Sequence, residues 1–123
     1  MNKELLIEGI KKLGMETTEE QIERFSKYSE LLKEWNNKIN LTAITDDDGI
    51  SVKHFLDSIL PLAHIEIKTG ANIADVGTGA GFPGLPIKII RDDINLTLID
   101  SLNKRINFLT LVSNELNLSN TVC

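Results

Sequence analysis

Cysteine is almost absent from this sequence: its single cysteine, Cys123, is also the last of 123 residues. No disulfide can form within the chain, which excludes the small disulfide-stapled domains typical of secreted proteins. Long apolar runs are missing too, and the segment Met1–Glu4 leads into an amphipathic stretch rather than the apolar core of a signal peptide. The sequence therefore predicts a cytoplasmic protein with no membrane-spanning or secretory segment.

Positive charge is also in short supply. Lys and Arg number 13 against 18 Asp and Glu, which gives a formal net charge of −5. Phosphate-driven binding of RNA or DNA normally needs a basic surface, so this balance argues against nucleic-acid binding by these residues alone. Metal ligands are sparse as well, because His54 and His64 lie far apart and lack the Cys or carboxylate spacing of a zinc site. We predict no metal site.

The composition is otherwise that of a globular protein, with 41% hydrophobic and 25% charged residues. A first helix is predicted over residues 3–13, followed by Gly14 in the position of a left-handed cap. Thr18 and Gln21 have the spacing of a capping box that begins a second helix. That helix carries one apolar stripe at steps of three and four, which predicts a core-facing surface: Ile22, Phe25, Tyr28, Leu32, Trp35 and Ile39.

A third helix is predicted after the acidic run Asp46–Gly49. The run lacks the alternate ligand spacing of a calcium loop, so it is interpreted as an N-cap. Pro61 should stop this helix. His54 and Asp57 lie one turn apart on it, a pair more typical of a structural hydrogen bond than of a catalytic couple.

The periodicity changes near residue 70. Ala71–Val76 is a short apolar run typical of a buried strand, Leu85–Ile90 can form a helix, and Ile94–Ile99 alternates as a strand does. Strand, loop, helix and strand make a βαβ unit whose crossover is nearly always right-handed, so the two strands should pair in parallel.

After these strands, Ser101 should cap a further helix that ends near Leu116, and Asn120–Cys123 is typical of the opening of a third strand. The predicted fold is therefore α/β, with a Rossmann-like parallel sheet. We predict a helical N-terminal subdomain over residues 1–70 and the first part of the α/β domain over residues 71–123.

The strongest local signal is a glycine-rich loop between the first predicted strand and the helix that follows. Four of the eight glycines in the chain fall within residues 77–84. Glycine allows positive φ angles and a close approach of ligand to backbone, and the following helix directs free amides at that ligand. A nucleotide-like cofactor is indicated.

One reading of the loop is a dinucleotide fingerprint. Gly79, Gly81 and Gly84 satisfy the G-x-G-x-x-G pattern, and Asp100 follows roughly where a ribose-binding acid belongs. On this reading the ligand would be NAD(P). Its first glycine, however, comes later than the turn expected directly after the strand.

In the other reading the glycine series begins at Gly77 and continues with Gly79 and Gly81. Asp75 then lies at the tip of the strand, just before the series. A carboxylate in that position would repel a pyrophosphate but would attract a ligand that carries an ammonium and a sulfonium group. S-adenosylmethionine carries both, and this register favours it.

Three segments together resemble a known family. Asn72–Lys88 (NIADVGTGAGFPGLPIK), Trp35–Ile44 (WNNKINLTAI) and His54–Ser58 (HFLDS) are similar to the ribosomal RNA small-subunit methyltransferase G family, also called glucose-inhibited division protein B. The resemblance covers nearly the whole chain. It implies a class I methyltransferase fold in the bacterial cytoplasm and an S-adenosylmethionine-dependent enzyme that methylates N7 of a guanine in 16S ribosomal RNA.

The resemblance also implies which residues contact the cofactor. The family's first cofactor contacts correspond to Gly77 and Phe82, while Gly79 and Gly81 would shape the loop. Asp75 would lie near the methionine end of the cofactor, and Asp100 could accept both ribose hydroxyls. Phe82 could equally be a hydrophobic plug behind the loop, and Asp100 a solvated strand-end acid.

No catalytic residue is assigned, because guanine N7 has an in-plane lone pair and no proton to remove. Methyl transfer to it therefore needs positioning and electrostatics more than a general base.

About half of the family's pattern is absent from these residues, including its adenine-side and RNA-facing parts. We therefore expect a truncated form with weak cofactor binding and no turnover, whose parent acts on 16S ribosomal RNA or the 30S subunit. The first strand should present an unpaired edge that favours self-association unless the N-terminal helices cover it. The alternatives are an NAD(P)-binding fragment and a non-catalytic interaction module that uses its amphipathic N-terminal helices.

Overall fold

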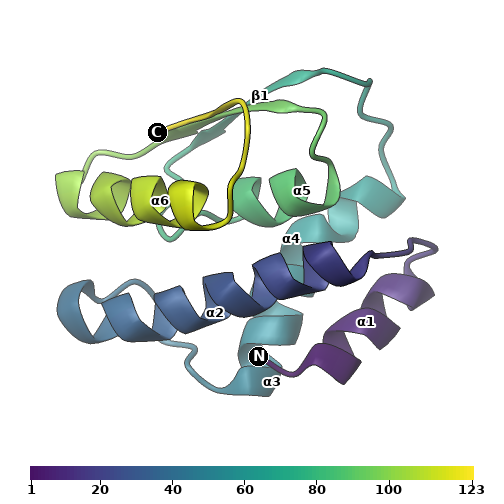
Figure 1. The fold of residues 1–123 in the computed structure, drawn as a ribbon, viewed down its shortest axis with the longest axis horizontal. Helices are drawn as coiled ribbons and strands as arrows, with labels where there is room; N and C mark the ends of the chain where they lie inside the picture. Colours follow the sequence, from purple (N-terminus) through teal and green to yellow (C-terminus); the bar gives the residue numbers. More distant parts are fainter.

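The computed structural model describes residues 1–123. Its elements follow one another in this order: α1 (Lys3–Lys12), α2 (Glu19–Ile39), α3 (Asp47–Gly49), a π-helical segment (Ile50–Leu56), α4 (Asp57–Ile59), a 3-10 turn (Leu60–Ala63), β1 (Asn72–Val76), α5 (Gly84–Ile90), β2 (Asn95–Ile99), α6 (Asn103–Glu115) and β3 (Thr121–Val122). Figure 1 shows these elements in layers, with the sheet on one side, α5 and α6 beneath it, and the N-terminal helices beyond them. The predicted α/β fold with a parallel sheet is confirmed.

The ends of the first two helices are set by local hydrogen bonds. Helix α1 ends in a Schellman motif, in which Gly14 has φ +83° and the Met15 amide donates to the Ile10 carbonyl over 3.2 Å. Helix α2 begins with the predicted capping box: the Thr18 hydroxyl accepts from the Gln21 amide (3.1 Å), and the Gln21 side chain accepts from the Thr18 amide (2.8 Å). Both boundary predictions are confirmed.

The third predicted helix is not a single α-helix. Asp46 caps α3 as predicted, by accepting a backbone amide over 2.8 Å. The chain then passes through the π-helical segment, α4 and the 3-10 turn. Pro61 lies inside that 3-10 turn instead of ending the helix before it. The prediction missed these changes because apolar spacing of three and four residues does not distinguish α from π or 3-10 hydrogen bonding.

One buried cluster of 19 residues joins the helical N-terminal part to the α/β part. Its members include Leu6 in α1 and Leu96 and Leu98 in β2. The predicted stripe of α2 is part of the core: Ile22, Phe25, Tyr28 and Leu32 are buried, and Trp35 and Ile39 pack partly buried against them. The division at residue 70 stays a prediction. None of the helices combines the length and apolar character that crossing a membrane requires.

The three strands form a parallel sheet in the order β1-β2-β3. In the register between the first two strands, Asp75 pairs with Leu98 and Val76 with Ile99. Strand β1 is therefore an edge strand that pairs on one side only, as the sequence predicts. The carboxyl ends of β1 and β2 lie next to each other, which brings the residues that follow both strands together.

One face of the sheet carries no helix. Helices α5 and α6 lie on the same side of the sheet (Figure 1). On the other side three apolar residues are largely exposed: Val76 (74%), Ile99 (45%) and Val122 (62%). This bare apolar face is defined here by those three residues.

The expected capping of α6 by Ser101 is wrong. The N-cap position is Leu102, whose side chain cannot form a capping hydrogen bond. The Leu102 amide donates instead to Asp100 Oδ1 over 3.0 Å. Asp100 therefore holds the residue that precedes the first turn of α6, and no side chain caps the helix itself.

Lys88 in α5 is fully buried, and burial lowers the pKa of its ammonium group. Its Nζ donates to the carbonyl oxygens of Asp92 (2.8 Å) and Ile94 (2.5 Å), which ties the end of α5 to the turn before β2. Lys88→Met keeps the side-chain length but removes both bonds. We expect it to lower the free energy of unfolding in urea by about 2 kcal/mol. Lys12→Met, at an exposed lysine of α1, should change it by less than about 0.5 kcal/mol; equal losses would contradict this assignment.

Candidate functional site

The glycine-rich loop joins β1 to α5 at the carboxyl end of the sheet. The amides of Gly77 and Thr78 both donate to the Ile99 carbonyl at the end of β2, over 2.8 and 3.1 Å. Gly77 and Gly79 have φ angles of +71° and +61°, and no atom lies within 4 Å of the position that a Cβ would take beyond each residue's own neighbours. These two glycines leave open space beside the backbone, into which a ligand can approach closely.

At the other two glycines of the loop, side chains of the same chain occupy the space beside the backbone. A Cβ at Gly81 would lie 2.6 Å from both Leu85 Cδ1 and Tyr28 Oη. A Cβ at Gly84 would lie 2.7 Å from Leu98 Cδ2. Neighbouring side chains therefore require glycine at these positions. The loop has an open half, at Gly77 and Gly79, and a closed half, at Gly81 and Gly84.

Asp75 holds the two ends of the loop together. Its Oδ2 accepts hydrogen bonds from the Thr78 hydroxyl (2.7 Å) and the Gly84 amide (2.9 Å). The Gly84 bond caps the beginning of α5, because that amide has no partner within the helix. Asp75 thus lies at the loop, as the register predicts, and stabilises it directly. Its role toward the methionine end of a cofactor stays a prediction.

Asp100 fastens the loop to the second strand. Its Oδ2 accepts from the Gly79 amide over 2.9 Å, and its Oδ1 accepts from the Leu102 amide and from Arg105 Nη1 (3.4 Å). The side chain is 3% exposed, so it is not a solvated acid. The Leu102 amide first, and then the Gly79 amide and Arg105, lower the pKa of Asp100 against the opposing effect of burial. Its role toward ribose hydroxyls stays a prediction.

Because the pKa of Asp100 is lowered in the folded state, the free energy of unfolding depends on pH in the acidic range. A carboxyl whose pKa is lower in the folded state contributes stability above its unfolded pKa of about 3.9, and loses that stability as the pH falls through the folded value. We expect Asp100→Asn to flatten the fall in stability below about pH 4. Urea unfolding of both proteins at several pH values measures this slope. Parallel curves for the two proteins would contradict the prediction.

Phe82 packs against aromatic rings from the N-terminal helices. It is stacked on the His54 ring, with centroids 4.4 Å apart and planes 8° apart, and on the Tyr28 ring at 5.6 Å. It also packs partly buried on the core cluster. This placement fits the alternative of a hydrophobic plug behind the loop, while a cofactor contact by Phe82 stays a prediction.

The expected hydrogen bond between His54 and Asp57 does not form. The Nε2 of His54 pairs instead with the Thr42 hydroxyl over 2.7 Å. Burial lowers the pKa of His54, and the negative charge of Asp57 partly offsets this effect. The sequence prediction failed because the closer partner comes from the loop after α2, which helical spacing does not describe.

Comparison with known proteins decides the family. A family model described as "GidB: rRNA small subunit methyltransferase G" matches residues 21–123. The chain belongs to this family. The resemblance inferred from three sequence segments is confirmed.

Several curated proteins named ribosomal RNA small subunit methyltransferase G are similar to this chain. The protein from Clostridium botulinum (strain Alaska E43 / Type E3) is 50% identical over 119 residues, which cover 97% of this chain and 50% of the relative. That of Clostridium perfringens (strain 13 / Type A) is 54% identical over 117 residues, covering 95% and 49%. That of Lysinibacillus sphaericus (strain C3-41) is 52% identical over 120 residues, covering 98% and 50%. The chain spans about half the length of these curated relatives.

The sequence did not predict Tyr28 as a site residue. Its hydroxyl donates to the Ala80 carbonyl in the loop over 2.6 Å. Burial, and secondly the charge of Asp75, raise the pKa of Tyr28 well above its ordinary value, so the hydroxyl stays protonated. A signal was the hydroxyl that Tyr28 carries into the apolar stripe, since a buried tyrosine hydroxyl usually has a partner.

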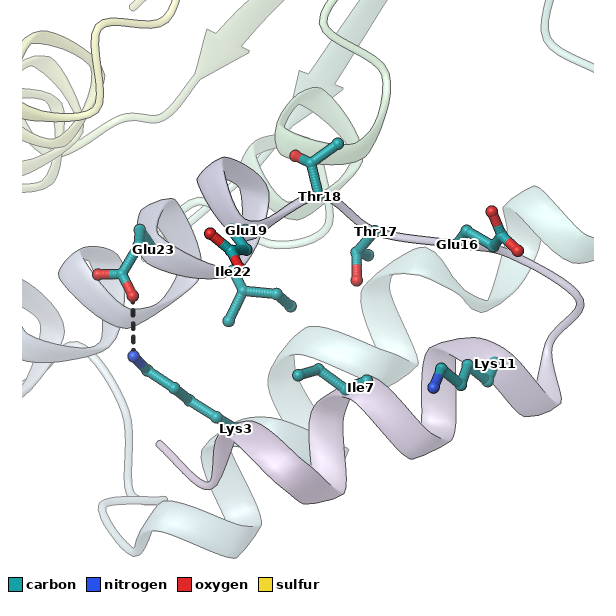
Figure 2. A pocket seen from close by; sticks show the side chains of 9 residues that line it. All are labelled: Lys3, Ile7, Lys11, Glu16, Thr17, Thr18, Glu19, Ile22 and Glu23. Atoms are coloured by element: carbon teal, nitrogen blue, oxygen red, sulfur yellow. Dashed lines mark hydrogen bonds and ion pairs between the residues drawn. The ribbon is translucent and has the colours of Figure 1, made fainter.

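A hollow lies away from the loop, between α1 and α2 (Figure 2). It has a volume of about 520 Å³ and carries charges of both signs. Lys3 and Glu23 face each other across it as an ion pair (2.9 Å), and Thr18 is engaged in the capping box. These three side chains therefore serve the local structure. No group of three or more His, Cys, Asp or Glu side chains could hold a metal ion.

Proposed function

We propose that this chain is the part of an S-adenosylmethionine-dependent methyltransferase that binds the methionine and ribose end of the cofactor. The observation that carries the proposal is the open half of the loop. Gly77 and Gly79 leave free space at the carboxyl ends of β1 and β2, where ligands bind in α/β sheets. Asp75 and Asp100 add negative charge there, which favours a ligand with a cationic end.

The residues present fit this ligand. A Cβ at either open glycine would enter the space that the ligand needs. Asp75 Oδ2 is engaged within the chain, while Oδ1 has no intramolecular hydrogen bond and can face a positive group. When bound, the cofactor supplies an activated methyl group. The chain's residues bind and orient it and are not required to move a proton.

For the whole protein we propose methylation of N7 of a guanine in 16S ribosomal RNA, within the 30S subunit or its RNA, in the cytoplasm. The family name supports small-subunit rRNA as the substrate. The 123-residue chain alone is proposed to be inactive, because its acidic charge does not suit RNA binding.

NMR titration of the chain with S-adenosylmethionine tests the cofactor, because this method also measures weak binding. We expect amide shifts at residues 77–84 and no competition by NAD. Gly79→Ala should weaken binding about tenfold, a loss of about 1.4 kcal/mol. Gly70→Ala is the matched control, since Gly70 also has a positive φ (+73°) and open space but lies outside the loop. Binding of NAD instead would favour the dinucleotide alternative, and binding of neither would favour an interaction module.

We also propose that the chain self-associates through the β1 edge and the bare apolar face. Ala74 is exposed on β1 and points to the same side as Val76, since both alternate with half-buried neighbours. Light scattering should show a dimer that Ala74→Lys disrupts. Asn114→Lys, which adds the same charge at an exposed site on α6, should leave the dimer intact. A wild-type chain that stays monomeric at high concentration would refute self-association.

A further inference from the structure

The middle of the loop is held by a side chain from the N-terminal part of the sequence. Tyr28 in α2 donates its hydroxyl to the Ala80 carbonyl over 2.6 Å. Gly81 leaves the space for this contact, because a Cβ there would lie 2.6 Å from Tyr28 Oη. The two residues are therefore complementary. Gly81 leaves room for the Tyr28 hydroxyl, and that hydroxyl fixes the Ala80 carbonyl.

The end of the loop is held by a second N-terminal contact. The His54 ring lies parallel to Phe82, at 4.4 Å between centroids and 8° between planes. Thr42 fixes the orientation of that ring through its hydroxyl (2.7 Å to Nε2). Thr42 itself is fixed by Asn36 Oδ1, which accepts from its amide over 2.8 Å. This chain of contacts links the end of α2 to the loop.

These contacts act on a different stretch of the loop from those of the two carboxylates. Asp75 and Asp100 hold Thr78, Gly79 and Gly84 from the sheet side. The N-terminal side chains Tyr28 and His54 hold residues 80–82. A loop ordered in the folded protein loses less conformational entropy when a ligand binds.

We infer that Tyr28 and His54 are positioning residues of the cofactor site. They hold residues 80–82 so that the open glycines Gly77 and Gly79 keep the arrangement that admits the ligand. This inference rests on the proposed function and goes beyond it, because it makes the helical N-terminal part a component of cofactor binding. Both side chains act through the loop.

The experiment compares S-adenosylmethionine affinity among single variants by NMR titration at low temperature, and circular dichroism first establishes which variants are folded. Tyr28→Phe removes the hydroxyl and keeps the ring. Thr42→Val removes the hydroxyl that orients His54, and Thr42→Ser restores it. We expect Tyr28→Phe and Thr42→Val each to raise Kd about five- to tenfold, the value of one lost hydrogen bond. Lys88→Met is the control for a general loss of stability, because its bonds lie at the far end of α5.

The second readout is amide hydrogen exchange at Gly81 and Phe82, both of which donate to the Thr78 carbonyl. Tyr28→Phe should speed exchange there more than in α6. Weaker binding with rescue by Thr42→Ser and unchanged affinity in Lys88→Met supports the inference. Equal affinity in all variants, or an equal loss in Lys88→Met, overturns it and leaves the proposed function standing. No binding by the wild-type chain overturns the proposed function and the inference with it. If Tyr28→Phe does not fold, the Thr42 pair decides.

Discussion

Gly81→Ala should destabilise the chain by about 3–5 kcal/mol, because overpacking and a strained backbone each cost about 1–3 kcal/mol. The residue has φ +105°, where an L side chain is strained. Its Cβ would also meet Leu85 Cδ1 and Tyr28 Oη at 2.6 Å and Leu109 Cδ2 at 3.0 Å. These neighbours belong to the core and cannot move outward freely. Urea unfolding measures the loss, which approaches the whole stability of a small domain.

Gly70→Ala separates the two causes. Gly70 has φ +73° with no atom within 4 Å of its Cβ position, so it reports backbone strain without the clash. We expect a loss of about 1 kcal/mol there. Equal losses at both positions would mean that the contacts around Gly81 relax at no cost, contrary to the packing described here.

Asp75→Ala should cost about 3–5 kcal/mol and abolish cofactor binding, because hydrogen bonds to a charged group contribute about 1.5–3 kcal/mol each. The substitution leaves the Thr78 hydroxyl and the Gly84 amide without their acceptor. The first turn of α5 and the closed half of the loop should then open together. Urea unfolding gives the loss, and faster hydrogen exchange at Gly84 locates it.

Asp57→Ala is the control for Asp75→Ala. Asp57 is exposed, and its side chain forms no hydrogen bond or ion pair. Its removal should change stability by less than about 0.5 kcal/mol. A similarly small effect of Asp75→Ala would show that water replaces the carboxylate at the loop, and would leave the charge argument for a cationic ligand without structural support.

Much of the fold could be predicted because its signals are local. The capping box at Thr18, the glycine after α1 and the alternation of β2 each specify a boundary through nearby atoms. The prediction failed where hydrogen-bond register was needed, in the π-helical segment, and at the start of α6, where the N-cap position is Leu102 and not Ser101. In both cases the apolar pattern is the same for the right and the wrong answer.

The candidate site could be located from the sequence but not described in detail. The strand ends placed Asp75, Asp100 and the glycines at one edge, as the structure has them. The difference between the open Gly79 and the packed Gly81 depends on Tyr28 and Leu109, which come from elements far apart in the chain. The partner of His54 likewise lies in a loop without periodicity.

The single core has a consequence for synthesis on the ribosome. Its members run from Leu6 to Leu116, so a nascent chain that ends before α6 lacks part of the surface on which α2 packs. At about 5–20 residues per second, the interval between completion of α2 and of Leu116 lasts roughly 4–15 s. During that time the apolar side of α2 lacks part of its cover, and chaperones that bind emerging polypeptides can bind there.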